Sequence, residues 1–524
     1  MIETLRACSL FNSVPEPALA ALAEIAERRE VRAGKNLFRA GEPCGHLYVI
    51  AHGQLIVTDD RGGGRVVAVA GEGDVLGTHA VLGASLHGVS ASATANVVVA
   101  ALESGALRDH LAQDPAAAVP VLTGVGQIIA RRLRFSVDAD APLFQPGART
   151  EHDLLGERDI PADALYGVQT LRATENFDIS GVRLNRFPAL IRALAQVKQA
   201  CARANRTVGL LSPELADAIE AAAEDLVTGR FHGHFVVDMI QGGAGTSTNM
   251  NVNEVIANRA LERMGHNRGD YDHCHPNNHV NLAQSTNDVY PTALRLATLS
   301  ELDSLLAAMS DLCDAFAEKA NEFSDIIKMG RTQLQDAVPM TLGQEFRAFA
   351  VTINEDIDRL RETSSLFYEI NLGGTAIGTG INTDPRYADE AIRALRQITG
   401  QPVVAAPDLI EATPDTGAFV MFSGVLKRAA IKLSKICNDL RLLSSGPRAG
   451  IGEIRLPPMQ PGSSIMPGKV NPVIPEVVNQ VAFRIVGNDL TITMAAHNGQ
   501  LQLNVMEPII ASACSSPSAS CAPP

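Results

Sequence analysis

The feature that most constrains the fold is a series of long segments in which apolar residues recur three and four positions apart. This spacing runs from Leu299 to Phe316 and from Phe346 to Phe367, and a third segment extends from about Phe419 to Leu443. Apolar residues spaced in this way lie on one face of an α-helix. Helices of more than about 20 residues with such faces are typical of long bundles. From Glu151 onward the chain is therefore predicted to be mainly helical around a long central bundle.

The first 135 residues have a different texture. An alanine- and leucine-rich segment from Pro15 to about Arg28 predicts a short helix, and Leu107 to about Leu133 predicts a second one. Regularly spaced short strands separated by turn residues indicate a β-roll or jelly roll. The strands predicted between the two helices are Val31–Phe38, His46–Ile50, Gln54–Thr58, Arg65–Val69 and Asn96–Leu102.

The chain is thus predicted to be multidomain, with an N-terminal all-β roll with flanking helices followed by a mainly α part. The stretch at 136–150 has two prolines and no apolar period, so it is interpreted as a linker. The predicted divisions are 1–135 for the β-roll, 136–150 for the linker, 151–290 for an N-terminal helical domain, 291–511 for the central bundle and 512–524 for a disordered tail.

Charge and cysteine usage exclude several classes of protein. The formal net charge is -14, which argues against a nucleic-acid-binding protein because such proteins present a basic patch or stripe. The sequence shows neither an apolar run long enough to span a bilayer nor a secretory signal. The 8 cysteines include no Cys-x-x-Cys pair. Reduced, mostly buried thiols in a cytoplasmic protein are therefore expected.

Four polar, glycine-bearing stretches stand near the ends of predicted helices. They lie at 241–251, 275–288, 330–337 and 462–471. Taken singly, each can be a helix N-cap or a surface turn. Together, spare N–H groups at helix N-termini and hydroxyl and amide donors form a site for a small di-anion. None of the stretches has Cys, His and Asp at metal-ligand spacing, so neither a metal nor a redox cofactor is required by this pattern.

In this order the four stretches resemble the site segments of the aspartase/fumarase superfamily, and Gly462–Asn471 matches its signature. The resemblance covers residues 151 to about 510. It implies a homotetramer with a shared central bundle and active sites built from three subunits. The segments Glu151–Ala162, Met340–Arg347 and Lys435–Arg448 are most similar to the aspartate ammonia-lyase family within it. Fumarases carry His at the position of Gln333, where aspartate ammonia-lyases carry Gln or His.

The resemblance also implies roles in converting L-aspartate to fumarate and ammonia. Ser463 is the expected general base, and Lys469 its cationic neighbour. Carried over residue by residue, the expected substrate-binding set is Thr246, Ser285, Thr286, Asn287, Gln333, Ser464, Met466 and Asn471. Thr246, Ser285, Thr286 and Ser464 are expected to stabilise an aci-carboxylate, Lys469 and Asn471 to hold the α-carboxylate, and Asn287 and Gln333 to face the amino group. A serine base needs a stabilised alkoxide, which closure of the loop would provide. No cofactor is expected to be required, and activation by a divalent cation stays open. The alternatives are a fumarate hydratase and a truncated, inactive regulatory lyase fusion.

The N-terminal unit resembles the cyclic nucleotide-binding domain family through Leu37–Pro43, Leu47–Ile50 and Gly53. That family binds the ribose and cyclic phosphate with a Gly-Glu pair and an Arg. The matching positions here are Gly77-Thr78 and Val89. Because valine cannot form the charged, bidentate hydrogen bonds of arginine, a cyclic nucleotide is not expected to bind. The preferred interpretation of this unit is a degenerate sensor domain that serves in assembly or binds another ligand. No helix-turn-helix pattern follows, which argues against a DNA-binding regulator.

The resemblance to the lyases ends near Pro508. Family members finish the last bundle helix beyond this point and add a small C-terminal domain, which is missing from this pattern. The Ser/Cys/Pro/Ala-rich end is interpreted as a disordered tail produced by truncation or by a shifted reading frame.

Overall fold

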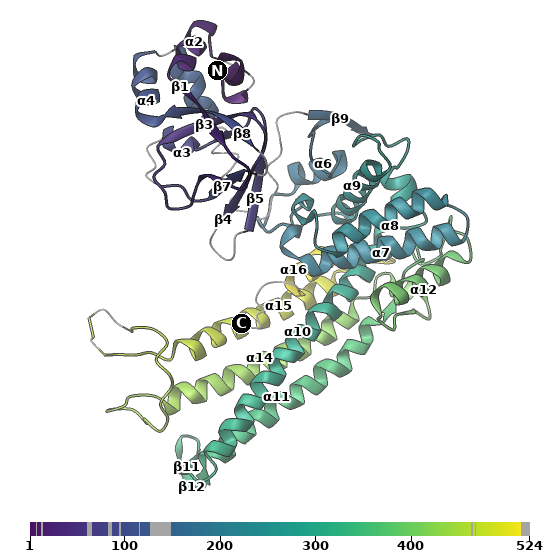
Figure 1. The fold of residues 1–524 in the computed structure, drawn as a ribbon. Coiled ribbons are helices and arrows are strands. Elements are labelled where there is room, and N and C mark those ends of the chain that lie inside the picture. Colours follow the sequence, from purple (N-terminus) through teal and green to yellow (C-terminus); the bar gives the residue numbers. More distant parts are fainter. Residues whose placement is uncertain are drawn as a thin grey trace. The chain divides into compact units, whose positions relative to one another are not determined.

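The computed structural model describes residues 1–6, 8–11, 14–59, 65–81, 86–93, 96–114, 116–125, 148–462, 465–466 and 468–514. The chain, drawn in Figure 1, divides into two compact units. One unit comprises Met1–Arg149 with Pro161–Ala164, and the other comprises Thr150–Ile160 with Leu165–Pro524. Most of the predicted linker at 136–150 lies outside the described residues, as do residues 515–524 of the tail predicted at 512–524. Residues 512–514, which were predicted to be disordered, are instead the end of a helix. The remaining domain boundaries stay predictions.

The N-terminal unit contains two four-stranded sheets. In the first, the order is β1 (Ala26–Val31), β8 (Val97–Glu103), β3 (His46–His52) and β6 (Val75–Leu76); in the second it is β2 (Asn36–Phe38), β7 (Ser90–Ala93), β4 (Leu55–Asp59) and β5 (Arg65–Ala70). Neighbouring strands are antiparallel. The helical elements are α1 (Ile2–Arg6), η1 (Ser9–Phe11), α2 (Glu16–Glu24), α3 (Thr78–Val81), α4 (Ser104–Gln113) and a segment at 116–125. The predicted all-β roll with flanking helices is confirmed.

Alternation along the central strands explains this arrangement, because successive side chains of a strand point to opposite faces. On β3, Leu47 and Val49 pack with the helices, whereas Tyr48 and Ile50 belong to the second core cluster, with residues of both sheets. Strand β8 repeats the pattern and is almost entirely buried. Two hydrophobic cores therefore share the first sheet.

Several predicted boundaries in this unit are wrong. The predicted helix to Arg28 ends at Glu24, and residues 26–31 instead form β1, because pairing with β8 along its whole length overrides the local helical pattern. The predicted strand Val31–Phe38 is two strands separated by a turn in which Gly34 has a φ of 74°. The second helix is interrupted after Gln113, where Asp114 accepts hydrogen bonds from the N–H groups of Ala116 and Ala117. Its predicted end, beyond residue 125, lies outside the described residues.

The second unit begins with a two-stranded sheet of β9 (Ala148–Asp153) and β10 (Gly156–Pro161). The helices that follow are α6 (Val168–Asn176), α7 (Pro188–Thr207), α8 (Pro213–Val227) and α9 (Thr246–Arg263), with the short turns η2 (Leu184–Arg186), η3 (His232–His234) and η4 (Pro276–Val280). Helix α7 packs on α8 and α10, and α8 packs on α9. This group of helices therefore covers one end of the bundle.

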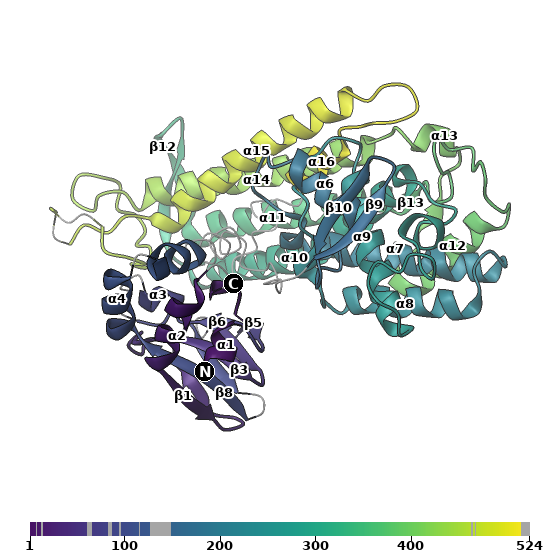
Figure 2. The same cartoon turned by 90° about the horizontal axis from the view of Figure 1, so that it is seen from above.

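Four long helices form the bundle: α10 (Thr286–Glu322), α11 (Leu342–Ser364), α14 (Gly417–Leu443) and α15 (Val473–His497). Helix α10 packs on α11, α11 on α14 and α14 on α15 (Figures 1 and 2). A hairpin of β11 (Ile327–Thr332) and β12 (Gln335–Thr341) joins α10 to α11. Between α11 and α14 lie η5 (Ser365–Phe367), β13 (Glu369–Ile370), α12 (Tyr387–Thr399), β14 (Val404–Ala405) and α13 (Leu409–Ala412). The predicted long central bundle is confirmed.

The last helical part of the bundle domain predicted at 291–511 is two helices. Helix α15 ends at His497, and α16 (Glu507–Cys514) packs back on it. The buried Asn504 donates hydrogen bonds to the carbonyl oxygens of Ala495 and Ala496 at the end of α15, which also accept from the backbone N–H groups of Asn498 and Gly499. In the part of the chain that the structure describes, no helix is long and apolar enough to cross a membrane.

Candidate functional site

A polar hollow of about 500 Å³ lies where the first turns of α9 and α10 meet. We call it the donor pocket. It is lined by Gln169, Thr246, Asn249, Met250, Asn277, Asn281, Ala283, Gln284, Ser285, Thr286, Thr375, Ala376, Ile381, Asn382 and Thr383. Two helix N-termini therefore converge on one hollow that is rich in hydroxyl and amide groups. This is the arrangement that favours an anion.

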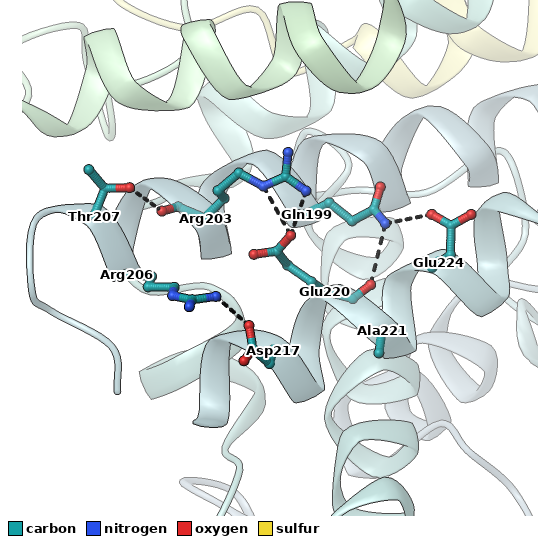
Figure 3. A pocket seen from close by; sticks show the side chains of 8 residues that line it. All are labelled: Gln199, Arg203, Arg206, Thr207, Asp217, Glu220, Ala221 and Glu224. Carbon is teal, nitrogen blue, oxygen red and sulfur yellow. Dashed lines mark hydrogen bonds and ion pairs between the residues drawn. The ribbon is translucent and has the colours of Figure 1, made fainter. Parts of the chain in front are cut away.

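A larger groove of about 710 Å³ between α7 and α8 differs in its chemistry (Figure 3). Its charged groups are paired with one another: Arg203 with Glu220, and Arg206 with Asp217. The amide of Gln199 donates to Glu224. Because these groups already satisfy each other, the donor pocket is the stronger candidate for binding a ligand.

Gly245 places Thr246 at the edge of the donor pocket. This glycine has a φ of 88° and directly precedes α9, and a Cβ atom there would lie 2.7 Å from the Tyr290 ring. Only glycine fits such a position without strain. Thr246 is exposed, and its hydroxyl donates to the Gly243 carbonyl oxygen at 2.7 Å. Donation to a ligand would exchange this hydrogen bond for a new one.

Ser285 and Thr286 form the start of α10. The Ser285 hydroxyl oxygen accepts the N–H of Asn287 at 3.1 Å within a capping box that includes Asp288, which confirms the N-cap interpretation. The Thr286 hydroxyl oxygen accepts from the Asn249 amide at 3.0 Å. In both cases the oxygen is the acceptor, so the hydroxyl proton remains to be donated. Asn287 is held differently, since its amide donates to the Ala376 carbonyl oxygen at 2.7 Å.

Asp288 supports the floor of the donor pocket from below. It is fully buried, and its carboxylate accepts from the N–H groups of Ser285, Gly373 and Thr375. Burial raises the pKa of this carboxyl to about 6, against the opposing effects of these hydrogen bonds and of Lys198. One side chain thereby ties α10 to the segment that carries Thr375.

The other predicted residues that the structure describes lie at the opposite end of the bundle. Helix α10 has 37 residues, which at about 1.5 Å per residue gives ~55 Å between Thr286 and the helix end. The β11–β12 hairpin lies beyond that end (Figure 1), and Gln333 is in the turn between its two strands. Met466, Lys469 and Asn471 lie in the loop before α15. The four polar stretches therefore do not meet within one chain: two form the donor pocket, and two form what we call the loop end.

The hairpin presents Gln333 through an unusual turn. Gln333 and Leu334 have φ values of 53° and 63°, in the left-handed region that non-glycine residues seldom adopt. Strand β11 of the hairpin is anchored by ion pairs of Lys328 with Glu345 and of Arg331 with Glu453. The hairpin is thus tied both to α11 and to the loop that follows α14.

Gly462 and Lys469, near the two ends of the 462–471 stretch, approach each other closely. A Cβ atom at Gly462 would lie 2.0 Å from the Lys469 carbonyl oxygen, so only glycine permits this approach. Lys469 is exposed, Met466 is 46% exposed and Asn471 is half-buried. Ser463 and Ser464 lie outside the described residues. Their assigned roles remain predictions.

Sequence reasoning missed part of the donor pocket. Asn249, Asn281 and Gln284 lie within the polar stretches at 241–251 and 275–288, yet they were not assigned as site residues. Thr375, Asn382 and Thr383 line the pocket from a segment about 90 residues farther along the chain. The segment at 372–383 is a polar, glycine-bearing stretch like the four that were selected, but it was not included with them. Its hydroxyl and amide groups were the available signal.

No metal site is evident among the described residues, where no group of three or more His, Cys, Asp or Glu side chains could hold an ion. His275 accepts the N–H groups of Asn277 and Asn278. It therefore caps the short turn η4.

In the N-terminal unit, the segment that resembles a cyclic-nucleotide site is built around Gly77. This glycine has a φ of 74°, and a Cβ atom there would lie 2.3 Å from the His46 carbonyl oxygen. The next residue, Thr78, is buried at the start of α3, and Val89 packs against the hydrophobic core. The His87 ring stacks on Phe38 at 3.8 Å. Thr78 and Val89 thus stand among apolar and aromatic residues, at positions that match the Glu and Arg of the cyclic nucleotide-binding domain family.

The long bundle and the donor-rich pocket at two helix N-termini define the fumarase-like class of lyases. A lyase family model matches residues 156–487, and a cyclic nucleotide-binding domain model matches residues 28–114. An aspartate ammonia-lyase of Pseudomonas canavaninivorans is 67% identical over 364 residues, which is 69% of this chain and 77% of that protein. That of Escherichia coli strain K12 is 58% identical over 366 residues, covering 70% and 77%.

Solved structures agree. A fumarate lyase:delta crystallin from Brucella melitensis bound to cobalt matches with a TM-score of 0.70 and 61% identity, covering 71% of this chain and 81% of that one. A class II fumarase from Schistosoma mansoni matches with a TM-score of 0.67 at 37% identity, covering 72% and 83%. The chain belongs to the aspartate ammonia-lyase family of carbon–nitrogen lyases, with a domain of the cyclic nucleotide-binding family at its N-terminal side.

Proposed function

We propose that this chain catalyses the reversible elimination of ammonia from L-aspartate to give fumarate. The observation that carries the proposal is the convergence of Thr246, Ser285 and Thr286 on one pocket at two helix N-termini, in a chain that is 67% identical over 364 residues to an aspartate ammonia-lyase. Such an array of donors is suited to a carboxylate whose negative charge increases during a reaction.

In the proposed mechanism, Ser463 removes a proton from C3 of aspartate. The electron pair left on C3 delocalises into the β-carboxylate and forms an aci-carboxylate with two negative charges. Thr246, Ser285, Thr286 and Ser464 donate hydrogen bonds to that group. Collapse of the intermediate forms the C2–C3 double bond and releases the amine, which leaves as ammonia after protonation. Lys469 and Asn471 bind the α-carboxylate, Asn287 and Gln333 face the amine, and Met466 lies beside the substrate.

The separation of the donor pocket from the loop end supports a shared site. Because ~55 Å of helix lies between Thr286 and the hairpin, one chain cannot bring both ends to one substrate. We therefore propose a homotetramer in which each site takes the donor pocket from one subunit and the two parts of the loop end from two others. Exposed apolar side chains along the bundle, including Met421, Phe483 and Leu490, supply surface for such an assembly.

The proposed enzyme needs no cofactor, because hydrogen-bond donors meet the developing charge. It acts in the cytoplasm, where thiols stay reduced; Cys8, Cys44, Cys201, Cys274 and Cys437 are buried and unpaired in the structure. No role for a cyclic nucleotide is included. The direct test is to incubate the chain with L-aspartate and to follow the ultraviolet absorbance of fumarate. Formation of fumarate from aspartate supports the proposal, and formation from L-malate alone would assign a fumarate hydratase instead.

A further inference from the structure

Lys198 is a buried lysine beneath the donor pocket. It lies in the middle of α7, and its side chain has no exposed surface. Lysine is almost never buried to this extent unless its ammonium group is satisfied by partners. Its Nζ atom lies 2.8 Å from Asn281 Oδ1 and 2.9 Å from Gln284 Oε1. Both of these amides line the donor pocket.

The lysine fixes the orientation of both amides. An ammonium group only donates, so each amide must turn its oxygen toward Lys198. Gln284 then directs its NH₂ group to the carbonyl oxygens of Val280 and Leu282. The Asn281 oxygen accepts a second hydrogen bond, from Asn249 Nδ2 at 3.2 Å.

Asn249 continues this chain to a predicted substrate donor. Its Nδ2 group also donates to Thr286 Oγ1 at 3.0 Å. Thr286 therefore accepts from the protein, and its own proton is directed to another acceptor. Three hydrogen bonds in series thus connect the Lys198 ammonium group with the Thr286 hydroxyl group. Lys198 and Asn249 both donate to the Asn281 oxygen, so the connection acts through orientation: the lysine holds that oxygen in place, and the oxygen holds the NH₂ group of Asn249 beside Thr286.

The charged and titratable groups around Lys198 come from three helices. Cys201 lies on α7, Asp288 lies on α10, and Tyr387 on α12 interacts with both. Burial lowers the pKa of the Lys198 ammonium group to about 7, while Cys201 and Asp288 act in the opposite direction. A second negative charge formed in the donor pocket would favour the protonated state of this lysine.

We propose that Lys198 is a positioning residue of the donor pocket, which acts through Asn281 and Asn249 to keep the Thr286 hydroxyl group donating to the substrate carboxylate. This inference rests on the proposed function for its kinetic readout. Lys198 itself touches no substrate. Its effect is therefore expected to depend on Thr286, which is the property that separates it from a lysine that only stabilises the fold.

The test is a double-mutant cycle in the full chain with Lys198→Met, Thr286→Val and the double variant. Lys198→Met should lower kcat about 10- to 100-fold, with a smaller change in KM, because the donor matters most as charge develops. The double variant should be within about threefold of Thr286→Val alone, since the two residues act in series. Lys319→Met, which removes a half-exposed lysine paired with Glu322, should retain wild-type kinetics.

Multiplicative losses in the double variant, or an unchanged kcat in Lys198→Met, would overturn the proposal. If Lys198→Met fails to fold, as judged by circular dichroism and gel filtration, Asn281→Ser replaces it in the cycle, because this variant breaks the same connection and leaves the lysine in place. Calorimetric binding of succinate by the same variants requires no turnover. A wild-type chain that binds succinate but does not convert aspartate would refute the proposed function. The double-mutant cycle measured by succinate binding would still decide the role of Lys198, because the double variant should then bind as Thr286→Val alone does.

Discussion

Two variants that are inactive alone should restore activity when their subunits are mixed. Thr286→Val removes a donor from the donor pocket, and Lys469→Met removes the cation from the loop end. Removing one preorganised donor commonly costs about 10²- to 10³-fold in kcat, so each variant alone should be nearly silent. The two positions are separated by the length of α10, which has 37 residues, or ~55 Å. In the proposed shared site they therefore come from different subunits.

The expected recovery follows from random assembly of a symmetric oligomer. With equal amounts of the two variants, a site receives an intact Thr286 with a probability of one half and an intact Lys469 with the same probability. About one quarter of the sites should then be intact, and the mixture should show about one quarter of the wild-type activity. Co-expression or joint refolding, followed by the aspartate assay, measures this fraction.

A matched control keeps both substitutions at the same end. Thr286→Val mixed with Ser285→Ala should show no recovery, because both variants damage the pocket contributed by a single chain. If the Thr286→Val and Lys469→Met mixture is as inactive as this control, the shared site is refuted, because a site built within one chain would always contain one damaged residue. Gel filtration of each mixture verifies that mixed oligomers have formed.

Three further predictions concern other parts of the chain. Ser463→Ala should lower turnover by several orders of magnitude with unchanged folding. If this variant keeps the turnover of the wild type, Ser463 is not the base. Burial raises the pKa of Glu507 to about 8 against the opposing effect of Arg295, so the native state holds a proton that the unfolded chain releases near pH 4.5. The stability that the protonated Glu507 carboxyl contributes is complete below about pH 4.5. It is lost as the pH rises to about 8, at about 1.4 kcal/mol per pKa unit. Glu507→Gln should flatten the pH dependence of the free energy of unfolding, whereas Glu362→Gln, at an exposed position, should leave it unchanged. A slope in Glu507→Gln equal to that of the wild type would contradict this prediction. Finally, neither cAMP nor cGMP should shift the melting temperature or the rate, and a clear thermal shift would show that Thr78 and Val89 permit binding.

The bundle could be predicted from the sequence because its information is local. Apolar residues three and four positions apart continue through the helices, and Thr341 with Gln344 forms a capping box where α11 begins. Strand β1 could not be found in this way. Its residues Ala26–Val31 continue a helical pattern, and only pairing with β8 selects the extended conformation.

The candidate site could be predicted in part for the same reason. Thr246 and Ser285 stand at helix starts that the sequence marks by glycine and by N-cap residues. The position of Thr375 depends on Asp288, which binds its N–H group across 87 residues of chain. The role of Lys198 depends on packing between α7 and α10, which places its ammonium group beside two amides. A lysine within an amphipathic helix gives no local sign of such burial.

The most direct test of the proposed reaction runs it in reverse. The full chain is incubated with fumarate and ammonium in D₂O, and the products are followed by proton NMR. Addition across the double bond should give L-aspartate with a single deuterium at C3, because the group that removes the C3 proton also returns it and exchanges with solvent. Malate as the only product, or fumarate that stays unchanged, would contradict the assignment of this chain as an aspartate ammonia-lyase.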